Sequence, residues 1–430
     1  MTAALLVMAA IVVLCYLVGA PISYGMIAAG CAYLVLSGVS LTEASAAIIG
    51  GVTANFVVLS VPLFIFTSAL LNGSGMTDRI FRFAQLLLGR SRGSLAQVNV
   101  LATVVFSGMT GSAVADVSGI GVMSVRAMED AGYPKDFACA TTITSAIMGP
   151  LLPPSIPLII YGFLSSTSIG ALFLAGIIPA AVLGVAHMGL IGYLARRKHL
   201  PTEPWLGWLP IGVTFLTGLP ALIAPLILIG GIYSGAFTPT ESSAMSILYV
   251  LVVGTFVYRS LSPREFLKAL RFAVRQTGAV TGLIAGAFLL NYAVTASEVP
   301  STISGFVLSL THQPLLLILL VSAFLLVAGL VLEVIVLEFV MLPIIVPIIS
   351  SAGVNMVYFG VVFTLVTMIA LGLPTLGTLN LVLSKITATP LSGIVRQMWP
   401  FLGLLVVGLA LVILVPGMST FLPHLAHLGG

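Results

Sequence analysis

The chain has 430 residues, of which 59% are hydrophobic and only 7% are charged, and its mean hydropathy is +1.22. These values exclude a soluble globular protein, and the net charge of +4 is spread over short segments, with no basic tail for nucleic acid. Runs such as 3–18 and 401–415 are apolar on every face, which excludes a transmembrane β-barrel and predicts an all-α polytopic protein in a lipid bilayer.

Three membrane spans and one interfacial segment are predicted before the first basic residues. The spans cover residues 3–19, 22–39 and 60–76, and the interfacial segment covers 42–57. A basic loop then carries Arg79, Arg82, Arg90 and Arg92. Because short basic loops remain on the cytoplasmic side, this loop sets the orientation of the chain.

The stretch 95–122 is predicted to enter the membrane without crossing it. Twelve residues, 95–106, rise only about 18 Å, whereas the hydrocarbon core is about 30 Å thick. A cluster of Gly, Ser and Thr between Ser107 and Ser112 interrupts the helix, and a second helix begins near Ala113. Basic residues flank both ends, which predicts a re-entrant hairpin that opens inward.

A second broken element lies within 141–162. Four prolines fall between Gly149 and Pro157, and proline cannot continue a regular helix because it lacks the N–H group and clashes with the preceding turn. A span at 172–194 follows, and the basic linker that ends at Pro204 marks the midpoint of the chain.

The second half repeats this order of elements. Its predicted parts are spans at 207–233 and 240–258, an amphipathic interfacial helix over 264–275, a span at 277–297, an outward-opening hairpin of 315–327 and 334–349, and a break over 372–380. Pro153 and Pro374 are 221 residues apart, as are Gly108 and Gly329. The shared offset predicts a duplication, and five full spans in each half predict that the repeats are inverted, with both termini outside.

Paired broken helices in inverted repeats place ligands near the midplane of the bilayer. Half-helix N-termini face anionic groups, and freed carbonyl groups take cations such as Na⁺. Ser107, Thr110, Ser112 and Ser155 supply hydroxyls here, while Gly108 and Gly111 allow the backbone to approach a ligand. The alternative is that these small residues form helix-packing faces, but the mirrored breaks favour a site.

Three acids lie in the region of the breaks. Asp116, Glu333 and Glu338 could hold a cation or a proton, since a charged group at membrane depth is costly to keep without a function. Asp116 could equally hydrogen-bond the backbone of its own hairpin. Glu333 is the better cation candidate of the two glutamates because it sits where the second hairpin turns. Glu241 follows Thr238 and Pro239, as a helix N-terminal acid does.

No enzyme signature and no nucleotide-binding loop occurs in the sequence, so the energy for transport would come from an ion gradient. The leading hypothesis is an ion-coupled secondary transporter. One alternative is a related elevator symporter or a proton-coupled transporter that works without a binding protein. The other, from a different class, is a membrane enzyme or a structural subunit with no transport cycle.

Three motifs carry a resemblance to a known family: 106–116, 149–156 and 230–241. They resemble the large membrane subunit of tripartite ATP-independent periplasmic (TRAP) transporters over nearly the whole chain. The resemblance implies an elevator mechanism and a Na⁺ gradient as the energy source. It also implies two partners, a periplasmic substrate-binding protein and a small four-helix membrane subunit, and a small carboxylate substrate such as a C4-dicarboxylate or sialic acid.

The same resemblance implies a location in the bacterial inner membrane and a division of the chain into scaffold and transport parts. The scaffold parts are 1–58, 171–275 and 391–430, and the transport parts are 59–170 and 276–390. The small subunit is expected to be a separate chain.

The breaks and the resemblance together predict two sets of site residues. Substrate is assigned to Ser107, Gly108, Thr110, Gly111, Ser112, Pro153, Pro154 and Ser155. Na⁺ is assigned to Ser107, Gly111, Ser112, Gly149, Pro150, Gly329, Glu333, Gly372, Pro374, Gly377 and Thr378.

The second half departs from the family pattern in two places. Leu373-Pro374-Thr375-Leu376-Gly377 stands where relatives read Thr-Pro-Pro-Val-Gly, and Glu333 stands where an aspartate is common. A lost hydroxyl at Leu373 and an added methylene at Glu333 would alter the second cation site, and with it the number of ions per cycle.

Overall fold

The computed structural model describes residues 2–40, 42, 45–46, 49–50, 59–88, 93–202, 208–299, 302–303, 305, 311, 313–330, 332–374, 377–426 and 428. Every regular element in these residues is a helix. Seven of the described helices are long and apolar enough to span a membrane, and this confirms the prediction of an all-α polytopic membrane protein. The predicted interfacial segment 42–57 lies mostly outside the described residues.

The first helices follow the predicted spans closely. They are α1 (Thr2–Val18), α2 (Ile22–Leu36) and α4 (Ser60–Gly73). The prediction of a basic loop at Arg79 and Arg82 is wrong, because both residues lie on helix α5 (Met76–Leu88). Buried Met76, Ile80 and Ala84 recur with helical spacing on α5, so the charges occupy the other face of an amphipathic helix.

The first hairpin has the predicted break, slightly displaced. Helix α6 (Ser94–Thr110) ends four residues later than predicted, because Ser107 to Thr110 still hold helical geometry. Gly111 then adopts φ 63°, a left-handed conformation that favours glycine, and α7 (Ala113–Asp116) begins where predicted. A π-helical turn, η1 (Val117–Gly121), and α8 (Val122–Asp130) complete the second arm.

The break after α9 is confirmed. The chain runs from α9 (Lys135–Met148) through one 3₁₀ turn, η2 (Gly149–Leu151), and an extended segment into α10 (Ile156–Ser165). The long helix α11 (Ile169–Arg197) closes the first half.

The second half opens with α12 (Trp208–Tyr233), α13 (Pro239–Val252) and η3 (Val253–Val257). A capping box between Thr238 and Glu241 starts α13, as expected of an N-terminal acid. The prediction of a separate interfacial helix and a span at 277–297 is wrong, because α14 (Pro263–Ala296) runs unbroken through both. No proline follows Pro263 within this segment, so nothing forces the helix to end.

The remaining helices match the predicted second hairpin and second break. They are α16 (Pro314–Ala328), α17 (Val334–Ser351), α18 (Met356–Leu371), α19 (Thr378–Thr387), α20 (Leu391–Leu414) and α21 (Gly417–Leu425). Helices α9 and α18 begin 221 residues apart, at Lys135 and Met356, and the starts of α10 and α19 and of α11 and α20 keep this spacing within one residue.

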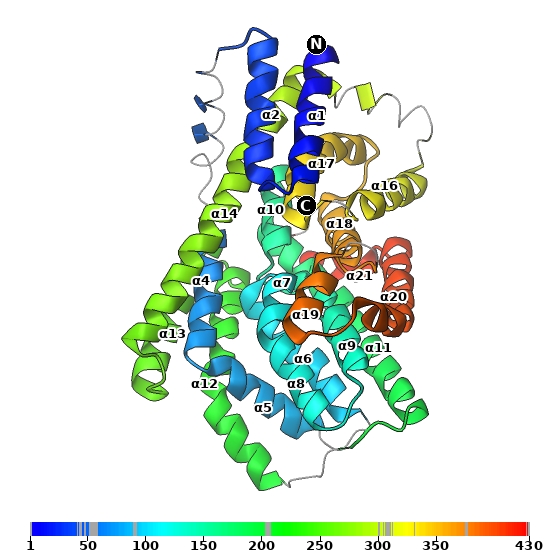
Figure 1. Cartoon of the computed structure of the whole chain (residues 1–430). Helices are drawn as coiled ribbons and strands as arrows, with labels where there is room; N and C mark the ends of the chain where they lie inside the picture. The colour runs from blue at the N-terminus through cyan, green and yellow to red at the C-terminus, as the bar shows by residue number, and fades with distance from the viewer. Residues whose placement is uncertain are drawn as a thin grey trace.

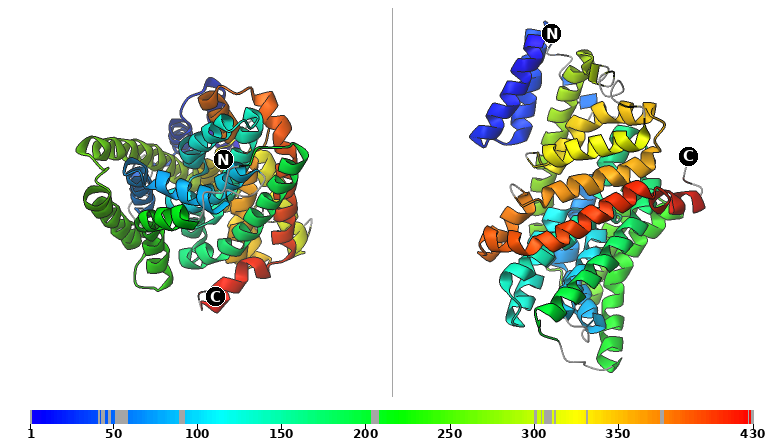
Figure 2. Two further views of the ribbon diagram at one scale, coloured as in Figure 1. Left: turned by 90° about the horizontal axis from the view of Figure 1, so that it is seen from below. Right: turned by 90° about the vertical axis from the view of Figure 1, so that its right-hand side faces the viewer.

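The helices pack in two groups (Figure 1). Helices α2, α4, α12, α13 and α14 lie along one side of the molecule, and α14 contacts both α2 and α4. The hairpins, the broken helices, α11 and α20 form the other group. Figure 2 shows α1 and α2 at one end of the molecule, beside α14 and away from α20 and α21.

Within the second group the two halves exchange partners. Helix α10 of the first half packs against α17 of the second hairpin, and α19 of the second half packs against η1 and α8 of the first hairpin. Helix α9 likewise packs against α20, and α18 packs against α11. Each break is therefore enclosed by elements of both halves, which brings the two hairpin tips together.

Candidate functional site

The tip of the first hairpin is a two-residue turn between α6 and α7. After Gly111 the backbone of Ser112 is extended, and the Ser112 hydroxyl accepts a hydrogen bond from the amide of Ala115 at 3.4 Å. Ser112 therefore caps the short helix that follows it, and its side chain is half-buried.

The loop of the first broken helix lies directly against this tip. The amide of Ile156 donates to the carbonyl of Gly111 at 3.3 Å. A Cβ atom added to Gly111 would lie 2.7 Å from the carbonyl oxygen of Pro154. Only glycine fits both the left-handed backbone and this close approach, which supports the sequence argument for Gly111. Ser155 is buried and caps α10 by accepting from the amide of Leu158.

Asp116 lies behind the tip and is 1% exposed. The hydroxyl of Thr110 donates to its Oδ1 atom, so its described hydrogen bond is to a side chain of the hairpin and not to the backbone. A Cβ atom added to Gly149 would lie 2.2 Å from the hydroxyl of Ser107 and 2.9 Å from Oδ2 of Asp116. Neither of these two oxygens makes a well-formed hydrogen bond with any described residue.

The turn of the second hairpin is also capped by a side-chain oxygen, here from a carboxylate in place of a hydroxyl. Glu333 begins α17, and its carboxylate accepts from the amide of Ile335 at 3.0 Å. Glu333 stands 221 residues after Ser112, so both hairpins place a helix-capping oxygen at their tips. Gly329 ends α16 against α18, where an added Cβ would lie 2.5 Å from Cβ of Ala370.

The second break is held by an asparagine that the sequence analysis gave no role. The Asn380 side chain donates to the carbonyls of Gly372 at 3.2 Å and Leu373 at 2.9 Å. These are carbonyls that the end of α18 leaves free. A single buried amide one turn into an apolar helix, just after a break, was the signal that could have found it.

The two broken helices also touch each other. A Cβ atom added to Gly372 would lie 2.3 Å from Cδ1 of Ile147 on α9. Pro374 is half-buried and Gly377 caps α19, so the predicted second-half residues lie at this break. Thr375 and Leu376, which carry part of the departure from the family pattern, lie outside the described residues.

A cavity joins all four of these elements. It has a volume of about 50 Å³, and it is lined by both hairpin tips, the first break and the end of α18 just before the second break. Its lining includes Gly111, Ser112, Pro150, Glu333 and Leu371. A volume of this size holds an ion or a few waters, whereas sites for small organic molecules take about 300–1,000 Å³. The space between the tips is therefore large enough for an ion and too small for a whole organic acid.

Not every predicted residue reaches this cavity. Ser107, Thr110, Gly149 and Asp116 form a second, fully buried polar cluster behind the first tip. Pro153 instead lines an apolar cavity with residues of α6, α11 and α12.

Glu338 lies on α17 beyond Glu333. Its side chain is 0% exposed, and both carboxylate oxygens lack a hydrogen-bond partner among the described residues. It is absent from the lining of the cavity at the tips.

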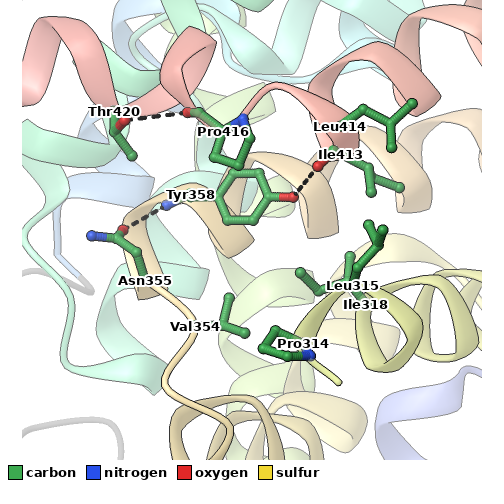
Figure 3. Close-up of a pocket in the computed structure, with 10 residues that line it drawn as sticks. All are labelled: Pro314, Leu315, Ile318, Val354, Asn355, Tyr358, Ile413, Leu414, Pro416 and Thr420. Carbon is green, nitrogen blue, oxygen red and sulfur yellow. Dashed lines mark hydrogen bonds between the residues drawn. The ribbon is translucent and has the colours of Figure 1, made fainter. Parts of the chain in front are cut away.

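A larger cavity of about 400 Å³ lies elsewhere, where α16, α18, α20 and α21 meet (Figure 3). Its lining is mostly apolar, and the hydroxyl of Tyr358 is turned aside to donate to the carbonyl of Ile413 at 2.8 Å. No charged side chain lines it, so it offers nothing to hold an anionic ligand. The smaller cavity at the tips is the better candidate because polar groups converge on it.

The chain is similar over most of its length to known proteins. The sequence pattern described as "Tripartite ATP-independent periplasmic transporter, DctM component" matches residues 9–418. The chain is 38% identical to the sialic acid TRAP transporter large permease protein SiaM of Vibrio cholerae over 95% of both chains. It is 33% identical to the C4-dicarboxylate TRAP transporter large permease protein DctM of Pseudomonas aeruginosa, covering 86% of this chain and 87% of that one.

Among solved structures, the fold is similar to that of the YdaH transporter of Alcanivorax borkumensis. The TM-score is 0.61 at 15% identity, covering 88% of this chain and 89% of that one. At this identity the likeness concerns the fold alone.

Proposed function

Since the chain belongs to the DctM family of tripartite ATP-independent periplasmic transporters, we propose that it carries a small carboxylate into the cell and that a Na⁺ gradient drives this uptake. As a member of this family it is a membrane permease subunit and not an enzyme. The observation that carries the proposal is the cavity that both hairpin tips, the first break and the end of α18 share.

The oxygen atoms at the first hairpin and at the cavity are suitable ligands for Na⁺. Ser107 and Asp116 present buried oxygens next to Gly149, and Glu333 and Ser112 line the cavity. Carboxylate, hydroxyl and carbonyl oxygens are the ligands that hard cations prefer, and broken helices commonly bind Na⁺ with their freed carbonyls. We assign the Na⁺ to these residues and to the carbonyls near Gly329, Gly372 and Gly377.

The carboxylate would bind at the same tips after the cavity widens. The N-termini of α10 and α17 begin at the cavity edge, and helix N-termini favour an anionic group. Ser112 and Ser155 supply hydroxyls there, together with the backbone of Gly108 and Gly111.

Two inverted repeats moving as an elevator account for the exchange of packing partners between the halves. The packing supports a moving part with other bounds than 59–170 and 276–390. Helices α11 and α20 pack against the broken helices α9 and α18, so we place both in the moving part. Helix α4 packs against α13 and α14, and we place it in the stationary frame.

Two relatives bear on the partners. The chain covers 66% of the sialic acid TRAP transporter permease protein SiaT of Haemophilus influenzae and 64% of the isethionate TRAP transporter permease protein DctMQ of Oleidesulfovibrio alaskensis. Both are longer than this chain, as expected if a small four-helix subunit is fused to them. We propose that this chain works with a separate small subunit and a periplasmic binding protein in the bacterial inner membrane, with both termini periplasmic.

Uptake into liposomes tests the proposal. The chain, its small membrane subunit and its binding protein are reconstituted, and labelled sialic acid and succinate are offered with an inward Na⁺ gradient, a K⁺ gradient or a pH gradient. We expect uptake of one of the carboxylates with the Na⁺ gradient only. Undiminished uptake without Na⁺ contradicts the coupling, and uptake driven by the pH gradient would favour buried Glu338 as a proton carrier.

A further inference from the structure

Three buried polar side chains lie in a line along one face of α6. Asn99, Thr103 and Ser107 are spaced four residues apart, so they share a helix face. Their side chains are 0–1% exposed. The Asn99 Oδ1 atom and the Thr103 hydroxyl have no hydrogen-bond partner among the described residues, and the Ser107 hydroxyl faces the Asp116 carboxylate.

The line follows the seam between α6, α9 and the second arm of the hairpin. At its lower end Asn99 donates to the hydroxyl of Thr142 at 3.1 Å. A Cβ added to Gly121 would lie 2.7 Å from the Thr142 methyl and 3.1 Å from the carbonyl oxygen of Asp116. At the upper end, Ser107 meets Gly149 and the Asp116 carboxylate.

The same three elements therefore meet at both ends of the line, and Thr103 lies between them. Eight residues of helix separate Asn99 from Ser107, which is about 12 Å along the axis. Gly121 and Gly149 carry no side chains into the seam. The three polar side chains therefore follow α6 from Thr142 at one end to the Asp116 carboxylate at the other.

Threonine and serine in a helix usually donate to the carbonyl four residues earlier. Thr141 on the neighbouring α9 does so, with its hydroxyl 2.9 Å from the carbonyl of Phe137. Thr103 and Ser107 do not: Ser107 turns to the Asp116 carboxylate, and the Thr103 hydroxyl stays available at a cost of about 1–3 kcal/mol if nothing pairs with it. Buried water or a cation pairs with such groups in proteins.

The line continues toward the open end of the hairpin. Ser124, one turn beyond Gly121 on α8, is 1% exposed and its hydroxyl also lacks a described partner. Arg126 and Lys135 lie at this end, which basic residues mark as the cytoplasmic side.

We propose that Asn99, Thr103 and Ser107 line a water-filled route by which the coupling cation passes between Asp116 and the cytoplasmic end of the first hairpin. This inference rests on the proposed Na⁺ coupling. Its lining of neutral oxygens, with a carboxylate at the top, attracts cations and repels the anionic substrate. The cation and the carboxylate therefore leave the protein by different ways.

The test compares two isosteric substitutions of buried threonines. Thr103→Val removes an unpaired hydroxyl from the line, and Thr141→Val removes a paired hydroxyl outside it. We expect Thr103→Val to slow Na⁺-driven uptake by about five- to tenfold, since the lost oxygen no longer stabilises the passing ion. The Na⁺ concentration at half-maximal uptake should stay unchanged, and Thr103→Ser should restore the rate.

Labelling gives a readout that a purely structural role would not move. In a background with Cys15, Cys31 and Cys139 replaced by serine, Thr103→Cys should react with a small cationic thiol reagent, more slowly in Na⁺ than in K⁺, while Thr141→Cys stays unreactive. Equal uptake and equal labelling at the two positions would overturn the route while leaving Na⁺ coupling intact. Wild-type uptake that does not depend on Na⁺ would overturn both the route and the Na⁺ coupling.

Discussion

Gly176→Ala is expected to destabilise the protein by about 3 kcal/mol or more, the upper end of the cost of overpacking a core. Gly176 lies on α11 where this helix crosses the first break, and an added Cβ would lie 1.9 Å from the carbonyl oxygen of Leu151. The obstacle is backbone and cannot rotate away. Helix α11 or the 3₁₀ turn before the prolines must shift, and the tip of the first hairpin packs on that turn.

Gly184→Ala is the matched control in the same helix. No atom lies within 4 Å of the position its Cβ would take, so alanine should stabilise the helix by about 0.5–1 kcal/mol through its higher helix propensity. The apparent melting temperature of the purified protein in detergent measures both changes. Shifts of the same sign and size for the two variants would contradict the close packing of α11 on the break.

Gly149→Ala is expected to reduce Na⁺-driven uptake by about tenfold or more, which corresponds to about 1.4 kcal/mol or more at the site. The backbone of Gly149 is right-handed helical, so alanine brings no conformational strain. Its methyl group would press on the hydroxyl of Ser107 and on the carboxylate of Asp116. Those two oxygens would separate or turn away, and the proposed cation site would lose its arrangement.

Gly403→Ala on α20 has open space around the added methyl group and should transport like the wild type. Rates are compared per folded protein, from the monodisperse fraction on size-exclusion chromatography. Normal uptake by Gly149→Ala would show that the cluster of Ser107 and Asp116 has no part in coupling.

The breaks could be predicted from the sequence because their causes are local. The four prolines at 150, 153, 154 and 157 together break a helix, whereas a single proline such as Pro179 is accommodated within α11, and Gly111 favours a left-handed turn by its own chemistry. The 221-residue offset then related the two breaks without any knowledge of their contacts. For this reason α9 ends and α10 begins close to the predicted first break, and α18 ends and α19 begins close to the predicted second break.

The wrong predictions of helix boundaries fall where basic residues lie on a segment with helical periodicity. The basic residues Arg79 and Arg82 suggest a loop, but the buried residues of α5 recur at helical spacing. The cations between Arg264 and Arg275 suggested a separate helix, whereas α14 continues through them. A helix can be amphipathic at one end and apolar at the other.

Contacts between distant residues could not be predicted at all. Nothing in the sequence relates Gly176 to Leu151 or Gly372 to Ile147, because each pair meets only through the packing of separate helices. The pairing of Asn380 with the carbonyls of Gly372 and Leu373 belongs to the same class. These contacts decide how tightly the site closes, which the motifs alone do not show.

Binding of Na⁺ to the purified chain tests the central claim most directly. The melting temperature is measured in NaCl and in KCl of equal ionic strength, for the wild type, for Asp116→Asn and for Glu265→Gln, an exposed acid paired with Lys268. Na⁺ at about 100 times its dissociation constant should stabilise the wild type and Glu265→Gln by about 2.7 kcal/mol relative to K⁺, and Asp116→Asn much less. Equal melting temperatures in the two salts, or a full Na⁺ effect in Asp116→Asn, would contradict a cation site at the first hairpin.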